Sequence, residues 1–299
     1  MHPSPTGRRA GSRTSAKTRS AMRLAATRNL LKVWGFVLAL SAALGLLGWS
    51  GGGYPLLSSV VFCSLLATAA AYWYADRVVM GMVGARELAL AEAPLVHSTL
   101  ERLAARANVA KPKLYVIPDG HPRAFAAGRG PRGSAIAVSR GLLGAAPPAE
   151  LEGVLAHELA HVRARDVVTQ EGVVVFAAAL VEATRIGGFM QRPLLFVLGP
   201  IAAAPVHLLL SPKREFAADR FAAELCESPH GLADALLRLE LAGELVEFRA
   251  NPATEPLYTI NPFEPTGLAA MFGTHPPTEE RVRRLRELDP EWREKLRAA

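Results

Sequence analysis

The stretch His157-Glu158-Leu159-Ala160-His161 decides the fold class of this chain. Residues four apart on a helix lie on one face, so the two imidazoles can converge on a single metal ion. Glu158 leans toward the same site, where its carboxylate can hold a reacting water. The alternative is a solvated amphipathic helix with two incidental histidines. A helix over 148–165 with a half-buried face is favoured by the apolar residues around the stretch: Leu151, Val154, Leu155 and Leu159.

A third ligand is expected further along the chain, because a catalytic zinc is held by three protein ligands and keeps one position open. Glu215 and Asp219 are again four residues apart and share a helix face. Glu215 would complete a His-His-Glu set, and Asp219 would accept the free N–H of His157. The alternative is a surface helix in which Arg214 and Arg220 pair with these acids.

Two further features favour a catalytic site. His275 lies in a Pro-rich loop, 251–277, and is a candidate donor to the oxygen of a scissile carbonyl; the alternative is a packing or capping histidine. The strand 134–138 is expected to be an edge strand along which an extended substrate pairs its backbone; the alternative is simply core. The substrate-binding residues would then be Ala135, Ile136, Ala137 and Val138.

Taken in order, five segments of the chain resemble the HtpX-like membrane zinc proteases, which are related to the CAAX prenyl endopeptidases and belong to the gluzincins. The resemblance covers about residues 30–290. It implies one zinc ion per chain on His157, His161 and Glu215, with Glu158 as the catalytic base. The segments are H-E-L-A-H at 157–161, E-F-A-A-D at 215–219, A-F-A-A-G-R at 124–129, S-A-I-A-V at 134–138 and G-T-H-P-P-T-E-E-R at 273–281.

The resemblance also implies a function: an integral-membrane endopeptidase with a cytoplasmic active site that cuts misfolded or surplus membrane proteins in protein quality control and the stress response. Two alternatives stay open, a prenyl-protein-type endopeptidase and a catalytically inactive membrane scaffold. The chain departs from the pattern at Arg123, where an Asn is expected, and in a long basic N-terminal segment.

The charge of the chain is concentrated at its beginning. The net charge is +7, yet residues 1–75 contain eight basic side chains and no Asp or Glu, so the remainder is close to neutral. This segment has no aromatic residue before Trp34, so we expect anionic lipid as its partner and no nucleic acid. With 50% hydrophobic residues the protein is neither disordered nor fibrous. Two cysteines indicate a reducing compartment.

Residues 33–75 carry no charge and divide into two apolar halves, 33–49 and 55–75, each about the 20 residues that cross a bilayer. We expect a transmembrane hairpin rather than a buried core hairpin or a cleaved signal peptide. The basic tail orients it with both ends in the cytoplasm. Two later apolar stretches, 172–183 and 193–210, form a second hairpin, a partly inserted one or a buried helix pair; the second hairpin is favoured.

The expected protein is mainly α with a small β-sheet: a zincin-like metalloprotease domain combined with two transmembrane helical hairpins, multi-pass in the inner (plasma) membrane. Helices are expected at 81–108, 213–227, 231–247 and within 279–297, and strands at 113–118, 125–127 and 134–138. The expected parts are a disordered basic tail at 1–29, a transmembrane hairpin at 30–78, the first part of the protease domain at 79–170, the second apolar hairpin at 171–210 and the second part of the protease domain at 211–299.

Overall fold

The computed structural model describes residues 76–185, 191–245, 252–260, 271–289 and 291, together with single positions between 35 and 74. The expected tail at 1–29 and most of the expected hairpin at 30–78 lie outside the described residues. The far end of the C-terminal segment, beyond residue 289, lies outside them as well except for Glu291.

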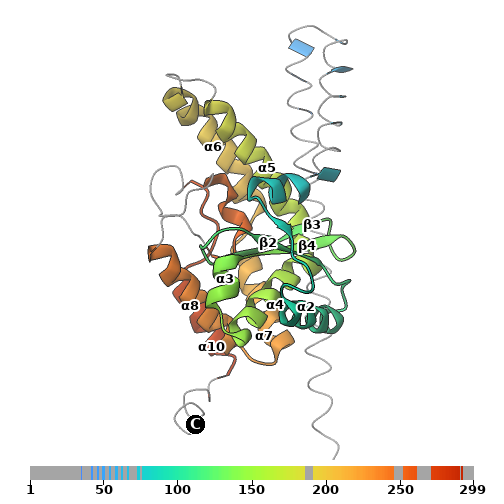
Figure 1. The fold of residues 1–299 in the computed structure, drawn as a ribbon. Coiled ribbons are helices and arrows are strands. Elements are labelled where there is room, and N and C mark those ends of the chain that lie inside the picture. Colours follow the sequence, from blue (N-terminus) through green and yellow to red (C-terminus); the bar gives the residue numbers. More distant parts are fainter. Residues whose placement is uncertain are drawn as a thin grey trace, which may run out of the picture.

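A small mixed sheet forms one layer of the domain (Figure 1). Its strands are β1 (Arg86–Glu87), β2 (Lys113–Ile117), β3 (Ala124–Gly128) and β4 (Ser134–Ser139). Strand β2 runs parallel to β4, whereas β3 and β4 form an antiparallel hairpin. The strands expected from the sequence are therefore present, and the chain is mainly helical with a small sheet.

The spatial order of the strands is β1-β2-β4-β3, which corrects one expectation. Strand β4, expected at an edge, lies inside the sheet, because β2 pairs with it on one side and β3 on the other. The outer strand of the hairpin is β3. Both strands of a hairpin look alike in sequence, and the parallel pairing of β2 decides which of them remains at the edge.

The helix expected over 81–108 is also wrong in its first half. Helical structure ends at Met82, and Gly84 turns the chain with a φ of +63°. The short strand β1 follows, and helix α2 (Pro94–Ala107) begins only at a proline, which needs no backbone hydrogen-bond partner in a first turn. The expectation failed because apolar residues continue at helical spacing on both sides of Gly84, whose left-handed conformation separates the two segments.

Helix α4 (Pro148–Ala164) lies at the centre of the helical layer and packs against β3, α2, α7 (Lys213–Cys226) and α8 (His230–Leu245). Gly153 permits the close approach of α8, because a Cβ there would lie 2.6 Å from the backbone nitrogen of Leu232. The short α3 (Arg140–Ala145) follows β4, and α10 (Thr278–Arg286) packs against α7 and α8. The expected helices at 148–165, 213–227 and 231–247 are present.

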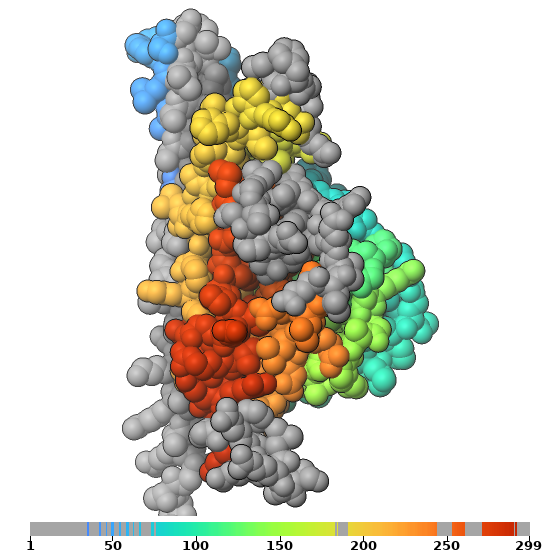
Figure 2. Space-filling view, turned by 90° about the vertical axis from the view of Figure 1, so that its left-hand side faces the viewer, coloured from blue at the N-terminus to red at the C-terminus, as the bar shows by residue number. Residues whose placement is uncertain are grey.

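The two later apolar stretches form a helix pair, α5 (Asp166–Arg185) and α6 (Gln191–Leu209). The two helices lie side by side and project from the domain (Figure 1), and yellow residues of this pair lie toward the upper part of Figure 2. A separate apolar cluster joins them, and the 3-10 helix η2 (Pro252–Leu257) packs against both. Among the described residues, α6 alone is long and apolar enough to cross a membrane.

Candidate metal centre

Helix α4 carries the two histidines on its buried side. It begins with Pro148 in its first turn and ends where Arg165 adopts a left-handed conformation, with its N–H directed at the carbonyl of His161. His157 and His161 are buried together at the contact between α4 and α7. The next residue, Asp166, begins α5, so the end of α4 and the start of the projecting helix pair adjoin the site.

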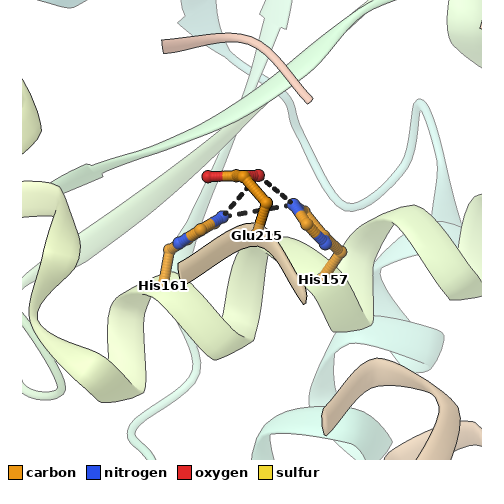
Figure 3. A group of neighbouring side chains, drawn as sticks. All are labelled: His157, His161 and Glu215. Atoms are coloured by element: carbon orange, nitrogen blue, oxygen red, sulfur yellow. Dashed lines mark hydrogen bonds and ion pairs between the residues drawn. The ribbon is translucent and has the colours of Figure 1, made fainter. Parts of the chain in front are cut away.

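The structure brings His157, His161 and Glu215 together, as Figure 3 shows. The Nε2 atoms of the two histidines are 3.1 Å apart, and Glu215 Oε2 lies 3.4 Å from Nε2 of His157 and 3.7 Å from Nε2 of His161. Tetrahedral nitrogen and oxygen ligands of a zinc ion are about 3.3–3.5 Å apart, given metal distances of about 2.0–2.2 Å. The three side chains therefore fit one such ion.

Each histidine is fixed by a carboxylate on its other ring nitrogen. Nδ1 of His157 lies 3.0 Å from Asp219 Oδ1, and Nδ1 of His161 lies 3.2 Å from Asp166 Oδ2. Nη2 of Arg281 lies farther from Nδ1 of His157, at 3.5 Å. A guanidinium cannot accept a hydrogen bond, so Asp219 is the group that accepts from Nδ1. With Nδ1–H donated to the carboxylates, both Nε2 lone pairs face the common point, as metal binding requires.

Glu215 is the clearest sign of an ion. Its side chain is 2% exposed, yet neither carboxylate oxygen accepts a hydrogen bond from the described residues. Arg214 Nε lies 3.0 Å from Oε1, without the geometry of a hydrogen bond. Burial alone would raise the pKa of Glu215, but the neighbouring basic groups of His161 and Arg214 hold it well below its usual range. A buried carboxylate without hydrogen bonds costs stability unless a cation completes it.

Asp219 is held from behind by Arg281, which is fully buried on α10. The guanidinium donates from Nε to Oδ2 at 2.8 Å and from Nη2 to Oδ1 at 2.6 Å. Burial would raise the pKa of Asp219, but Arg281 lowers it, so the carboxylate stays charged. Arg281 thereby links α10 to the carboxylate of Asp219 on α7.

Glu158 is buried beside the histidines, on the same helix. Its Oε1 accepts a hydrogen bond of 2.9 Å from the hydroxyl of Thr259, which also lies 3.3 Å from the carbonyl of Ala124 on β3. Arg281 Nη1 donates to the backbone carbonyl of Thr259 at 2.5 Å. Sequence reasoning missed Thr259, because the residue carries no motif and approaches the site only through the folding of its segment.

His275 also lies beside this centre. Its Nε2 lies 3.8 Å from Glu215 Oε2, and its Nδ1 lies 2.8 Å from Glu255 Oε1. It is not one of the three residues whose ligand atoms all lie within 4.8 Å of one another. Sequence reasoning also missed Glu255, and it assigned Asp166 no role. Asp166 did carry a signal, since it is an acid directly after the helix that holds His161.

The residues expected to bind substrate lie elsewhere in the sheet than expected. Ala135, Ile136, Ala137 and Val138 belong to the interior strand β4, and their backbone is paired on both sides. The backbone carbonyl of Arg123 accepts a hydrogen bond from the N–H of Ser139, so Arg123 directs its backbone groups toward β4. Because this direction alternates along an antiparallel strand, the backbone groups of Ala124, Ala126 and Gly128 point toward the free edge of β3. The list of edge residues is therefore Ala124, Ala126 and Gly128.

Arg123, the departure from the family pattern, lies just before β3. Its guanidinium forms an ion pair with Asp119, donates to the Tyr258 hydroxyl at 3.4 Å and stacks over the ring of that tyrosine, 5.2 Å from its centroid. The side chain is therefore engaged with the segment that carries Thr259 and Glu255.

Two histidines on one helix, a glutamate after the first of them and a carboxylate from a later helix define a class of protein, the metallopeptidases of gluzincin type. The chain belongs to peptidase family M48, whose model matches residues 90–289. It is a membrane zinc endopeptidase, and the resemblance to HtpX-like proteases is confirmed.

Curated relatives match nearly from end to end. The chain is 37% identical to a protease HtpX homolog of Persephonella marina over 84% of this chain and 96% of that protein. It is 38% identical to a protease HtpX homolog of Pelotomaculum thermopropionicum over 86% of this chain and 98% of that one. A crystal structure of Ste24p from S. mikatae matches with a TM-score of 0.47 and 16% identity, over 89% of this chain and 66% of that chain, just under two thirds of its length.

Proposed function

We propose that His157, His161 and Glu215 bind the zinc ion of this endopeptidase and that Glu158 is its general base. The observation that carries the proposal is the orphaned carboxylate of Glu215 facing two Nε2 atoms whose rings are fixed by Asp219 and Asp166. Bound there, zinc supplies a Lewis acid that polarises the scissile carbonyl and makes water reactive at neutral pH.

The chain's own groups perform the proton transfers. Glu158 takes a proton from the attacking water and passes it to the leaving amine. Thr259 holds Oε1 of Glu158, so Oε2 is the oxygen left for the proton. His275 donates from Nε2 to the carbonyl oxygen as negative charge develops there.

The substrate backbone pairs with the edge of β3, and only a short length of this edge is available for pairing. The hydroxyl of Thr259 reaches the carbonyl of Ala124, and Glu171 Oε1 accepts the N–H of Gly128 at 2.7 Å. Between them Ala126 presents both its outward N–H and its C=O without a partner among the described residues. A short backbone contact of this kind binds many sequences, because it does not depend on side chains.

We further propose that the chain is a multi-pass protein of the plasma membrane with its catalytic centre in the cytoplasm. Helix α6 supports this, because it is long and apolar and exposes large side chains, with Phe196 84% and Leu208 71% exposed. Leu46, Phe62 and Leu66, among the described positions of the first expected hairpin, are also exposed. Large apolar side chains left exposed on such segments are typical of a lipid-facing surface.

The physiological substrates we propose are misfolded or surplus membrane proteins. A site that reads backbone rather than side chains favours unfolded segments over a defined sequence. An orphan subunit co-reconstituted in liposomes should be cut, and the same subunit should resist when assembled in its complex. Equal cleavage of both forms would contradict the quality-control role. Cleavage of a farnesylated peptide alone would favour the prenyl-protein alternative.

The central test is Glu158→Gln in the detergent-purified protein, measured by zinc content and casein cleavage. The variant should retain zinc and lose cleavage, because the amide cannot accept the proton. Glu150→Gln is the matched control, since Glu150 is a buried carboxylate on the same helix that pairs with Arg238. Cleavage by Glu158→Gln at the wild-type rate would refute the mechanism. If the wild-type protein itself shows no zinc-dependent cleavage, the result would support the scaffold alternative.

Reporter fusions test the orientation. Fusions after Gly51 and after Arg86 should report an external and a cytoplasmic location respectively. The reverse pattern would place the catalytic centre outside the cytoplasm.

A further inference from the structure

Glu255 is a completely buried carboxylate that the mechanism above does not use. It lies in η2, far in sequence from helix α4, and its side chain is 0% exposed. Its hydrogen-bond donors come from two adjacent residues: the backbone N–H of Thr274 at 3.3 Å, the hydroxyl of Thr274 at 3.1 Å, and Nδ1 of His275 at 2.8 Å. A buried carboxylate is retained at a cost, so its partners indicate its use.

Of these donors, only the imidazole connects Glu255 to the metal centre. A histidine that donates Nδ1–H to a carboxylate has its ring orientation fixed, and it donates from Nε2 as well when the ring carries both protons. The other nitrogen, Nε2, then points away from Glu255, and it lies 3.8 Å from Glu215 Oε2. Thr274 holds both oxygens of Glu255 from the neighbouring backbone, so the carboxylate itself cannot rotate away from the ring.

We propose that Glu255 is a positioning residue that aims Nε2 of His275 at the reacting carbonyl. The inference rests on the proposed role of His275 as donor and adds the group that sets its direction. The bond from Nδ1 to Glu255 supplies the orientation that a histidine in a Pro-rich loop, outside any helix, would otherwise lack.

Glu255→Gln tests this with little change of shape. The carboxylate accepts from His275 on one oxygen and from Thr274 on both, whereas an amide offers one oxygen and turns its NH₂ toward a donor. We expect kcat to fall by about 10-fold, the range typical of a residue that orients an active-site histidine, with KM and zinc content unchanged. Glu150→Gln is again the control and should keep the wild-type kcat.

A second readout does not depend on activity. In the metal-free protein labelled with ¹⁵N-histidine, and assigned with His275→Gln, Nδ1 of His275 should carry a proton that is hydrogen-bonded to Glu255. In Glu255→Gln the signal of this Nδ1–H should shift, because its hydrogen bond to the carboxylate is lost. A wild-type His275 whose Nδ1 carries no proton would overturn the inference.

A double-variant cycle separates positioning from a merely structural role. In the His275→Gln background, adding Glu255→Gln should cost no further kcat, because the ring it positions is absent. An equal loss in both backgrounds would overturn the inference. If Glu255→Gln fails to fold, Glu255→Asp replaces it: the shortened carboxylate keeps Thr274 but withdraws from Nδ1, so kcat should fall while the melting temperature stays near wild type, and an unchanged kcat overturns the inference.

The same set distinguishes the two failures. If His275→Gln keeps the wild-type kcat, the donor role of His275 in the proposed function is wrong, and the ¹⁵N measurement still decides whether Glu255 fixes the ring. If His275→Gln is impaired and Glu255→Gln is not, the donor role stands and the positioning inference is wrong.

Discussion

Arg281→Met is the sharpest perturbation that the structure offers. Methionine keeps much of the aliphatic volume but removes the donors that bind both oxygens of Asp219 and the carbonyl of Thr259. The carboxylate of Asp219 is then left in the interior with the ring of His157 as its remaining partner. The loss therefore combines an unpaired buried charge with two broken links between α10 and the metal centre.

The expected magnitude follows from the burial of both partners, with side chains 1% and 5% exposed. Removing one partner of such a pair costs about 3–5 kcal/mol of unfolding free energy. At about 2–4 °C per kcal/mol, the melting temperature should fall by about 6–20 °C. The assay is thermal unfolding of the zinc-loaded protein in detergent, with zinc content measured before each scan.

Arg283→Met is the control, because Arg283 lies on the same helix with its side chain 57% exposed and pairs only at the surface, with Glu280 and Glu287. It should leave the melting temperature near that of wild type. An equal shift in both variants would refute the reasoning. In Arg281→Met, adding Asp219→Asn removes the orphaned charge, so the double variant should melt above the single one; a further decrease would show that the charge is not the cause.

Three other outcomes are expected. Gly128→Ala should lower the unfolding free energy by about 1–3 kcal/mol, because Gly128 has a φ of +113° and its Cβ would lie 2.3 Å from the carbonyl of Gly133. Gly133→Ala, with open space around its Cβ, should leave the unfolding free energy nearly unchanged. Equal losses of unfolding free energy in the two variants, measured by denaturant titration, would contradict this. Thr259→Val should lower kcat by about 10-fold with KM unchanged, since Glu158 loses its hydrogen bond; a change confined to KM would assign Thr259 to substrate binding. Chelation should lower the melting temperature and zinc should restore it, whereas a temperature unaffected by chelator would contradict a metal that joins α4 to α7.

The sequence predicted those parts of the fold that depend on local spacing. Helices α4 and α7 follow from apolar residues and paired ligands at intervals of four, and the β3–β4 hairpin follows from alternation around a Gly-rich turn. The juxtaposition of Glu215 with the two histidines could be expected because a metal ion imposes a known ligand set. The chemical roles of these residues remain predictions to be tested.

What the sequence could not supply depends on contacts between distant segments. The interior place of β4 is set by its parallel pairing with β2. No turn in the sequence indicates this pairing, because the two strands are not joined by a hairpin. Thr259 and Glu255 approach the centre from a loop whose path is fixed by its packing on α5, and neither carries a recognisable motif. Arg281 could equally have been one more surface arginine, and only its enclosure by α7, α8 and the loop makes it a bridge.

The position of the α5–α6 pair in the chain determines the order in which the residues of the site are synthesised. The two histidines emerge before the pair and Glu215 emerges after it, so the nascent chain lacks one member of the proposed ligand set until the whole pair has been made. Helix α7 then has to dock on α4 for the set to close. On the proposed ligand set, a nascent chain therefore cannot bind the metal with all three residues before α7 has been made and has docked on α4.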